Sequence, residues 1–140
     1  MAGTLTAPNA TRDERHWLER HRSTLSPTTL RAKWIHEPGD RPDRNGQTLA
    51  TRSRDVIRHW AEERRGAPVA ATRGDSNGRP RVLWLDFPGA SSGVRLQAVS
   101  WDEWFGVFDE RNLVFLFQER LRNGDQSTFF RLDSPDRERG

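Results

Sequence analysis

The chain has 140 residues, room for one domain of ordinary size and a short extension. Charged residues make up 31% of it and hydrophobic residues 33%, while six tryptophans and seven phenylalanines supply apolar area for a core. No run approaches the roughly 18 apolar residues of a membrane span, and the N-terminus lacks the basic start and apolar stretch of a secretory signal. The absence of cysteine excludes disulfides, zinc–thiolate sites and cysteine nucleophiles. We therefore expect a cytoplasmic protein with no membrane partner.

The net charge of +3 accompanies a sequence pI of about 10.7. Every basic residue except Lys33 is arginine and tyrosine is absent, so almost nothing titrates between about pH 8 and 12. The small positive net charge therefore persists to strongly alkaline pH. The high pI alone is weak support for nucleic-acid binding. Residues 1–80 carry the positive excess and residues 81–140 are mildly acidic. The sequence thus predicts any anion-binding surface in the first 80 residues.

The first 53 residues are predicted to precede the main domain. Residues 1–10 are expected to be a disordered lead-in. Residues 11–36 are predicted to be an N-terminal helical extension, because Thr11 begins a capping box with Glu14 and Ser26 stands before Pro27 at the start of a second short helix. Residues 37–53, rich in Pro, Gly and Asp, are predicted to be a linker.

Residues 54–133 are predicted to form an α+β domain. Its first helix covers about 54–65 and ends at Gly66. Strands are expected near 68–72, 81–87 and 94–99.

A second domain helix is predicted to begin at Ser100, which forms a capping box with Glu103. Its aromatic residues recur at helical spacing, at Trp101, Trp104, Phe105 and Phe108. This stripe has more apolar area than one helix over a small sheet needs, and Trp17 and Trp34 lie outside the domain. Either the N-terminal helices dock on the domain, or a homodimer or another protein partner covers these surfaces.

The last predicted element is a β-hairpin around Asn123-Gly124, a dipeptide typical of type I′ turns. With that dipeptide as the loop, Phe117 faces Phe130, Phe115 faces Leu132, and Arg122 faces Asp125. Residues 134–140 are expected to be a frayed tail. The predicted fold is a small antiparallel sheet with two helices on one face, preceded by the N-terminal helical extension.

Residues 47–135 resemble a family of short, uncharacterised bacterial proteins. The segments that carry the resemblance are 55–68, 85–89, 100–105, 108–111, 118–119 and 127–134. Members of that family often carry the label "1,4-alpha-glucan branching enzyme". Branching enzymes hold their acids in a barrel of about 250 residues, which this chain is too short to form. The resemblance therefore implies a shared fold and a bacterial cytoplasmic setting, and no reaction.

Residues that could perform catalysis or bind a cofactor have simpler structural explanations. Asp102 and Glu103 stand where they cap a helix and complement its dipole. His16 and His21 are five residues apart, which does not place them on one helical face as metal ligands. Residues 74–78 lack the Lys and the Ser or Thr of a phosphate-binding loop. We assign no catalytic residue, metal site or cofactor.

We expect a small, non-enzymatic binding or structural module. The alternative from another class is a nucleic-acid-binding protein that uses an arginine-rich N-terminal half, and a glucan-acting enzyme is a third. The candidate phosphate-contacting residues surround the first domain helix and the hairpin after it: Arg58, Arg64, Arg65, Arg73, Arg79 and Arg81. An uncovered aromatic patch would favour the partner-binding module, and a contiguous arginine face without acids would favour nucleic acid.

Overall fold

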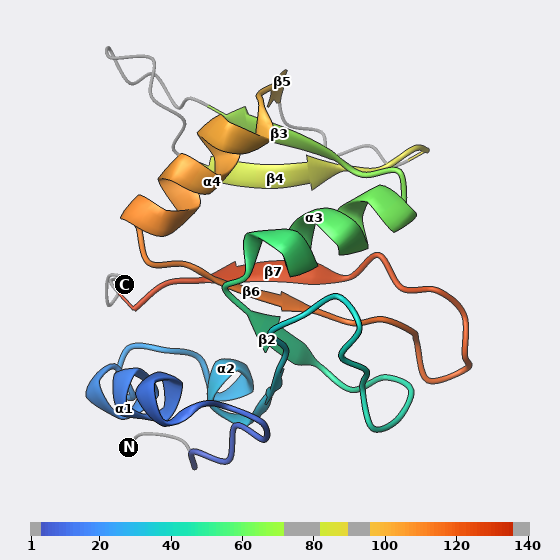
Figure 1. Ribbon diagram of the computed structural model, residues 1–140. Helices are drawn as coiled ribbons and strands as arrows, with labels where there is room; N and C mark the ends of the chain where they lie inside the picture. The colour runs from blue at the N-terminus through green and yellow to red at the C-terminus, as the bar shows by residue number, and fades with distance from the viewer. Residues whose placement is uncertain (1–3, 72–81, 90–95, 136–140) are drawn as a thin grey trace.

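A computed structural model describes residues 4–71, 82–89 and 96–135 of the chain. The α+β class predicted from the sequence is confirmed (Figure 1). The helices are α1 (Arg12–Arg20), α2 (Pro27–Arg31), α3 (Arg54–Glu63) and α4 (Trp101–Glu110). The strands are β1 (Lys33–Trp34), β2 (Leu49–Thr51), β3 (Ala67–Ala71), β4 (Val82–Asp86), β5 (Gln97–Ala98), β6 (Val114–Phe117) and β7 (Phe130–Asp133).

The described strands form two sheets where the sequence predicts one. The larger sheet has the order β1-β2-β6-β7 and the smaller has the order β4-β3-β5. All neighbouring strands are antiparallel except β1 and β2, which pair in parallel. Strand β6 lies inside the larger sheet and all four of its residues are buried, so both faces of that sheet must be covered.

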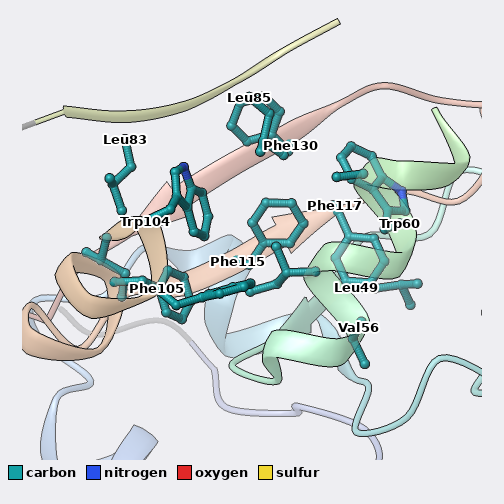
Figure 2. Close-up of a cluster of buried hydrophobic side chains, with 14 of the residues drawn as sticks. Leu49, Val56, Trp60, Leu83, Leu85, Trp104, Phe105, Phe115, Phe117 and Phe130 are labelled. Carbon is teal, nitrogen blue, oxygen red and sulfur yellow. The ribbon is translucent and has the colours of Figure 1, made fainter. Parts of the chain in front are cut away.

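A main core fills the space between the larger sheet, α3, α4 and the smaller sheet (Figures 1 and 2). Phe115 and Phe117 enter it from β6, and Leu83 and Leu85 enter it from β4. Trp60 of α3 lies at its centre, with four phenylalanine rings between 5.5 and 6.4 Å from its own. The aromatic stripe of α4 is part of this core, since Trp104, Phe105 and Phe108 are buried in it. The two domain helices therefore lie on one face of the larger sheet, as predicted.

A second core lies on the opposite face of the larger sheet. Val114 and Leu116 point into it from β6, and α1 and α2 cover them (Figure 1). Trp34 is fully buried there and Trp17 packs against its edge. Docking of the N-terminal helices on the domain is thus what covers both tryptophans. We call residues 4–31 the N-terminal layer.

The first residues and the segment 37–53 are more ordered than the sequence predicts. The backbone amides of Thr6 and Ala7 donate to the carbonyl of Leu30, and Ala7 is completely buried. Residues 4–10 are therefore held against α2 and do not form a disordered lead-in. Strand β2 takes the end of the expected linker into the larger sheet, between β1 and β6.

The hairpin has the predicted register in its strands and a different turn. Phe117 pairs with Phe130 and Phe115 with Leu132, as expected. The loop, however, contains three residues, Arg122 to Gly124, because the Gly124 amide donates to the Leu121 carbonyl. Leu121, and not Arg122, therefore lies opposite Asp125.

A bulge returns the hairpin to the predicted register. Ser127 bonds to Glu119, whereas Gln118 bonds to Phe129, so Thr128 is an extra residue on its strand. The one-residue shift made by the longer loop is thereby cancelled before β7 begins.

Both predicted capping boxes are present, at Thr11 with Glu14 and at Ser100 with Glu103. The end of α3 differs in one respect from the prediction. Arg65 has a φ of 58°, and the Gly66 amide donates to the Ala61 carbonyl. Arg65 therefore occupies the left-handed position of a Schellman motif and Gly66 the position after it.

Candidate nucleic-acid interface

The structure separates the arginines that the sequence grouped as phosphate contacts. Arg58 is exposed on α3 and pairs with Glu62 at 3.2 Å. Arg65 is exposed just after that helix. Arg64, between them in sequence, is buried. Arg73, Arg79 and Arg81 lie outside the described residues. The described members therefore form no contiguous basic face.

Arg64 is not a candidate phosphate contact, because its guanidinium is buried and donates its hydrogen bonds within the protein. Its side chain is 1% exposed and donates to the carbonyls of Trp60, Glu119 and Ser127. The guanidinium carbon also lies 4.4 Å from the Trp60 ring centre. Burial lowers the pKa of Arg64, and the charge of Glu119 opposes that effect. This arginine joins α3 to the hairpin and cannot reach a phosphate.

A different set of arginines is brought together by two turns with the same tripeptide. Arg-Asn-Gly occurs at residues 44–46 and again at residues 122–124. Both glycines have positive φ, 82° for Gly46 and 94° for Gly124. We call these two turns the RNG pair.

The two turns of the RNG pair are in direct contact. The Gly46 amide donates to the Arg120 carbonyl at 2.9 Å. A Cβ at Gly46 would lie 2.7 Å from Cγ of Arg122, and a Cβ at Gly124 would lie 3.7 Å from Nδ2 of Asn45. Each glycine therefore faces the other turn closely enough that a side chain at Gly46 would collide with it.

Four exposed arginines lie in the RNG pair or just before it in sequence: Arg44 and Arg122 within the turns, and Arg41 and Arg120 before them. Within the described chain no acid lies within ion-pair distance of any of them. The acids nearby have other partners, because Asp43 pairs with Lys33 and Glu119 with Arg64. Asp125 accepts a hydrogen bond from the Asn123 amide.

The pKa of Asp43 reflects this positive environment. The hydrogen bond from Lys33 lowers it most, the bond from Gln47 lowers it further, and the charge of Arg44 adds to the effect. Asp43 is therefore a bound counter-charge for Lys33, and the RNG pair and its four arginines remain a net basic surface.

Sequence reasoning missed this surface for an identifiable reason. Arg120 and Arg122 belong to the half of the chain that is acidic on balance, and Arg41 and Arg44 belong to the predicted linker. The repeated tripeptide was the available signal. The contact between its two copies is a long-range one, which local patterns do not predict.

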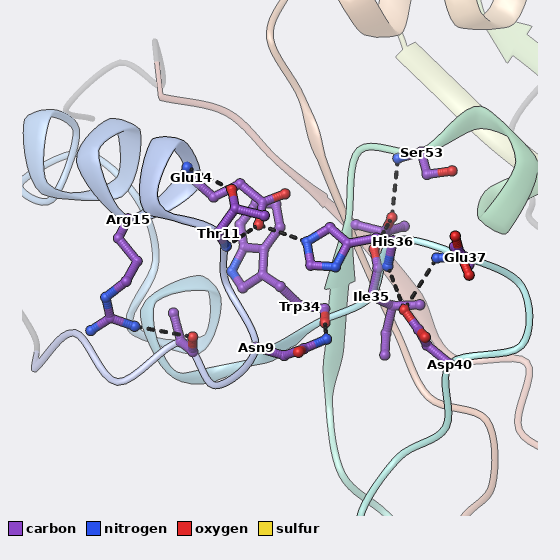
Figure 3. A network of polar contacts seen from close by, with 12 residues as sticks. Asn9, Thr11, Glu14, Arg15, Trp34, Ile35, His36, Glu37, Asp40 and Ser53 are labelled. Atoms are coloured by element: carbon purple, nitrogen blue, oxygen red, sulfur yellow. Dashed lines mark hydrogen bonds and ion pairs between the residues drawn. The ribbon is translucent and has the colours of Figure 1, made fainter.

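Several carboxylates and histidines have structural partners. Glu103 accepts from the backbone and hydroxyl of Ser100, as the capping-box prediction requires, and Asp109 pairs with Arg54. His36 contacts Glu14 at 2.7 Å, joining the segment after β1 to the first turn of α1 (Figure 3). No group of three potential metal ligands comes together in the part of the chain that the structure describes.

Among the described residues, three large apolar side chains are exposed: Trp84, Leu121 and Phe129, at 41 to 43%. The Trp84 ring lies against Phe130, 4.6 Å between centres. Leu121 stands between the two arginines of the hairpin tip. The exposed aromatic area is thus on β4 and the hairpin and not on the α4 stripe that first suggested a partner.

The chain matches no protein-family model, no curated protein and no solved structure with which it was compared. The family resemblance stated from the sequence therefore stays a prediction. None of the helices in the described ranges has the length and apolar character needed to cross a membrane.

Proposed function

We propose that this protein is a non-enzymatic binding module that holds the phosphate backbone of a nucleic acid with the arginines of the RNG pair. One observation carries the proposal. The bond between Gly46 and Arg120 unites two segments more than 70 residues apart, and the four arginines that they bear are exposed and have no acid partner within the described chain.

Arginine suits this role because its planar guanidinium can donate two parallel hydrogen bonds to a phosphate. A rigid backbone beneath the side chains adds to the fit. The turns that carry Arg44 and Arg122 are fixed against each other by the Gly46 contact, so their cations are presented at a set spacing. Four such cations would release several counterions from a nucleic acid, which makes binding fall steeply with salt.

The test is fluorescence anisotropy with a labelled oligonucleotide of about 12 nucleotides, titrated between about 50 and 300 mM salt. The variant Arg44→Ala/Arg122→Ala removes one cation from each turn and no described ion pair. We expect weaker binding, and a log–log salt slope for a single strand that is shallower by about 1.4, or about 0.7 for each lost phosphate contact.

The charge-matched control is Arg12→Ala/Arg20→Ala on α1, which removes two exposed arginines from the N-terminal layer. It should leave the salt slope unchanged. Equal losses in both double variants would assign the effect to net charge and overturn the proposal, as would an absence of binding by the wild-type protein at the lowest salt.

A protein partner is the second candidate, and the exposure of Trp84 favours it. Its ring is 42% exposed on β4 with Phe130 behind it, and such a ring beside a second aromatic is a typical anchor of an interface. A second copy of this chain is the simplest partner. Sedimentation at high concentration should then show a dimer that Trp84→Ala abolishes, and a purely monomeric profile would contradict this candidate.

A further inference from the structure

One face of the β6–β7 hairpin, next to the RNG pair, carries an exposed aromatic side chain and an exposed cationic one. Phe130 points into the main core beside Phe117, so alternation along the strand turns Phe129 and Arg131 toward the opposite face. Phe129 is 43% exposed, and Arg131 is exposed as well. No described acid pairs with Arg131. We call Phe129 and Arg131 the hairpin strip.

The N-terminal layer explains where this strip begins. Asp133 belongs to the same face of β7 but is buried, because Ser26 and Thr29 at the start of α2 bond to its carboxylate. Two and four residues back along the strand, Arg131 and Phe129 are exposed. The layer therefore covers one end of the face and leaves the end nearer the loop open.

The strip is continuous with the RNG pair. Gln118 lies opposite Phe129, since its backbone amide donates to the Phe129 carbonyl. The side-chain amide of Gln118 donates to the Gly46 carbonyl at 3.2 Å. The first RNG turn thus borders the same face from which the Phe129 ring projects. One surface holds a cation at Arg131, a ring at Phe129 and the arginines of the RNG pair beyond it.

We infer that this surface takes single-stranded nucleic acid, with Phe129 as a platform for one unpaired base and Arg131 and the RNG arginines on the flanking phosphates. The inference rests on the proposed function and narrows its ligand. Only an unpaired base can offer its whole face to a ring, because the bases of a duplex are already stacked on each other. Arg131 stands two residues from Phe129, about 7 Å along an extended strand, so cation and ring serve neighbouring parts of one chain.

The experiment compares one labelled single strand of about 12 nucleotides with its duplex, for the wild-type protein and for variants at Phe129. Phe129→Leu keeps an apolar side chain and removes the aromatic face. It should weaken single-strand binding about 5-fold to 100-fold and leave duplex binding unchanged. Phe129→Trp should restore the affinity. Arg131→Ala should make the single-strand salt slope shallower by about 0.7.

The matched control is Trp84→Leu, which removes an aromatic ring of equal exposure that lies against Phe130 and so on the other side of β7. At a protein concentration where sedimentation shows the wild type to be monomeric, it should leave single-strand binding at the wild-type level. Wild-type binding by Phe129→Leu, or a duplex bound as tightly as the single strand, would overturn this inference. Either result would leave the proposed function standing if Arg44→Ala/Arg122→Ala still flattens the salt slope. An absence of salt-dependent binding by the wild-type protein to either ligand would overturn both the inference and the proposed function.

Discussion

The backbone amide of Ser26 donates a hydrogen bond of 2.9 Å to the carboxylate of Asp133, which lies 107 residues further along the chain. The Thr29 hydroxyl donates to the same oxygen. Asp133 is 3% exposed at the end of β7, so this buried carboxylate caps the first turn of α2 from the far end of the sequence. It ties the N-terminal layer to β7, at the opposite edge of the larger sheet from β1, where the Trp34 amide donates to the Pro8 carbonyl.

Asp133→Ala should therefore lower the free energy of unfolding by about 3 kcal/mol, because two donors lose a charged acceptor in a buried place. Thr29→Val removes one of the two bonds and should cost less. Urea unfolding followed by tryptophan fluorescence measures both. Hydrogen exchange should show residues 26–36 opening before the main core in Asp133→Ala. Protection of that segment equal to the wild type would contradict the role given to Asp133.

Arg64 provides a second long-range link, between the end of α3 and the hairpin. Arg64→Leu removes the hydrogen bonds to the carbonyls of Trp60, Glu119 and Ser127 and leaves the Glu119 charge without its partner. We expect a loss of about 3 to 5 kcal/mol in the free energy of unfolding. Arg58→Leu on the same helix breaks only an exposed pair with Glu62, and should change it by less than about 1 kcal/mol. Similar costs for the two variants would show that Arg64 is not the buried link.

These two links also show where local sequence rules end. The capping boxes at Thr11 and Ser100 follow from four-residue patterns, and both were predicted correctly. The pairing of Phe117 with Phe130 was predicted from an Asn-Gly turn of the wrong type, and a bulge at Thr128 made the register right. Short-range patterns thus predicted the helix starts and the hairpin strands. The correct register of the hairpin, however, depended on the bulge at Thr128, which no short-range pattern indicates.

The candidate interface was not predictable for the same reason. Strands β1 and β2 have two and three residues, too few for a periodic pattern, and β2 lies in a Gly-rich and Pro-rich segment. If β1 and β2 are not predicted, the position of the segment between them relative to the larger sheet cannot be predicted either. The meeting of Gly46 with Arg122 then cannot be foreseen. Arg64 was grouped with its exposed neighbours because burial at the last turn of α3 depends on a hairpin 55 residues away.

Asp40 makes the stability of the loop after β1 depend on pH. The hydrogen bond from the backbone amide of His36 lowers the pKa of Asp40 most, burial raises it by less, and the bond from the Glu37 amide lowers it further (Figure 3). A carboxylate whose pKa is depressed on folding stabilises the protein above its unfolded pKa, and that contribution disappears as the pH falls through the folded pKa. Asp40→Asn should therefore be less stable than the wild type at pH 7, and the difference should shrink below about pH 4. Urea unfolding at several pH values measures it, and a difference that grows toward low pH would contradict the assignment.

Trp34 and Trp104 form a natural comparison, since both indoles are completely buried and only one has a hydrogen-bond partner. The Nε1 of Trp104 donates to the Trp84 carbonyl at 3.0 Å, whereas Nε1 of Trp34 finds no acceptor within the described chain. Phenylalanine in either position removes similar volume, but at Trp104 it also removes the hydrogen bond to the Trp84 carbonyl. Trp104→Phe should therefore cost about 1 to 2 kcal/mol more than Trp34→Phe in urea unfolding. A larger cost at Trp34 would mean that its indole N–H is bonded in solution.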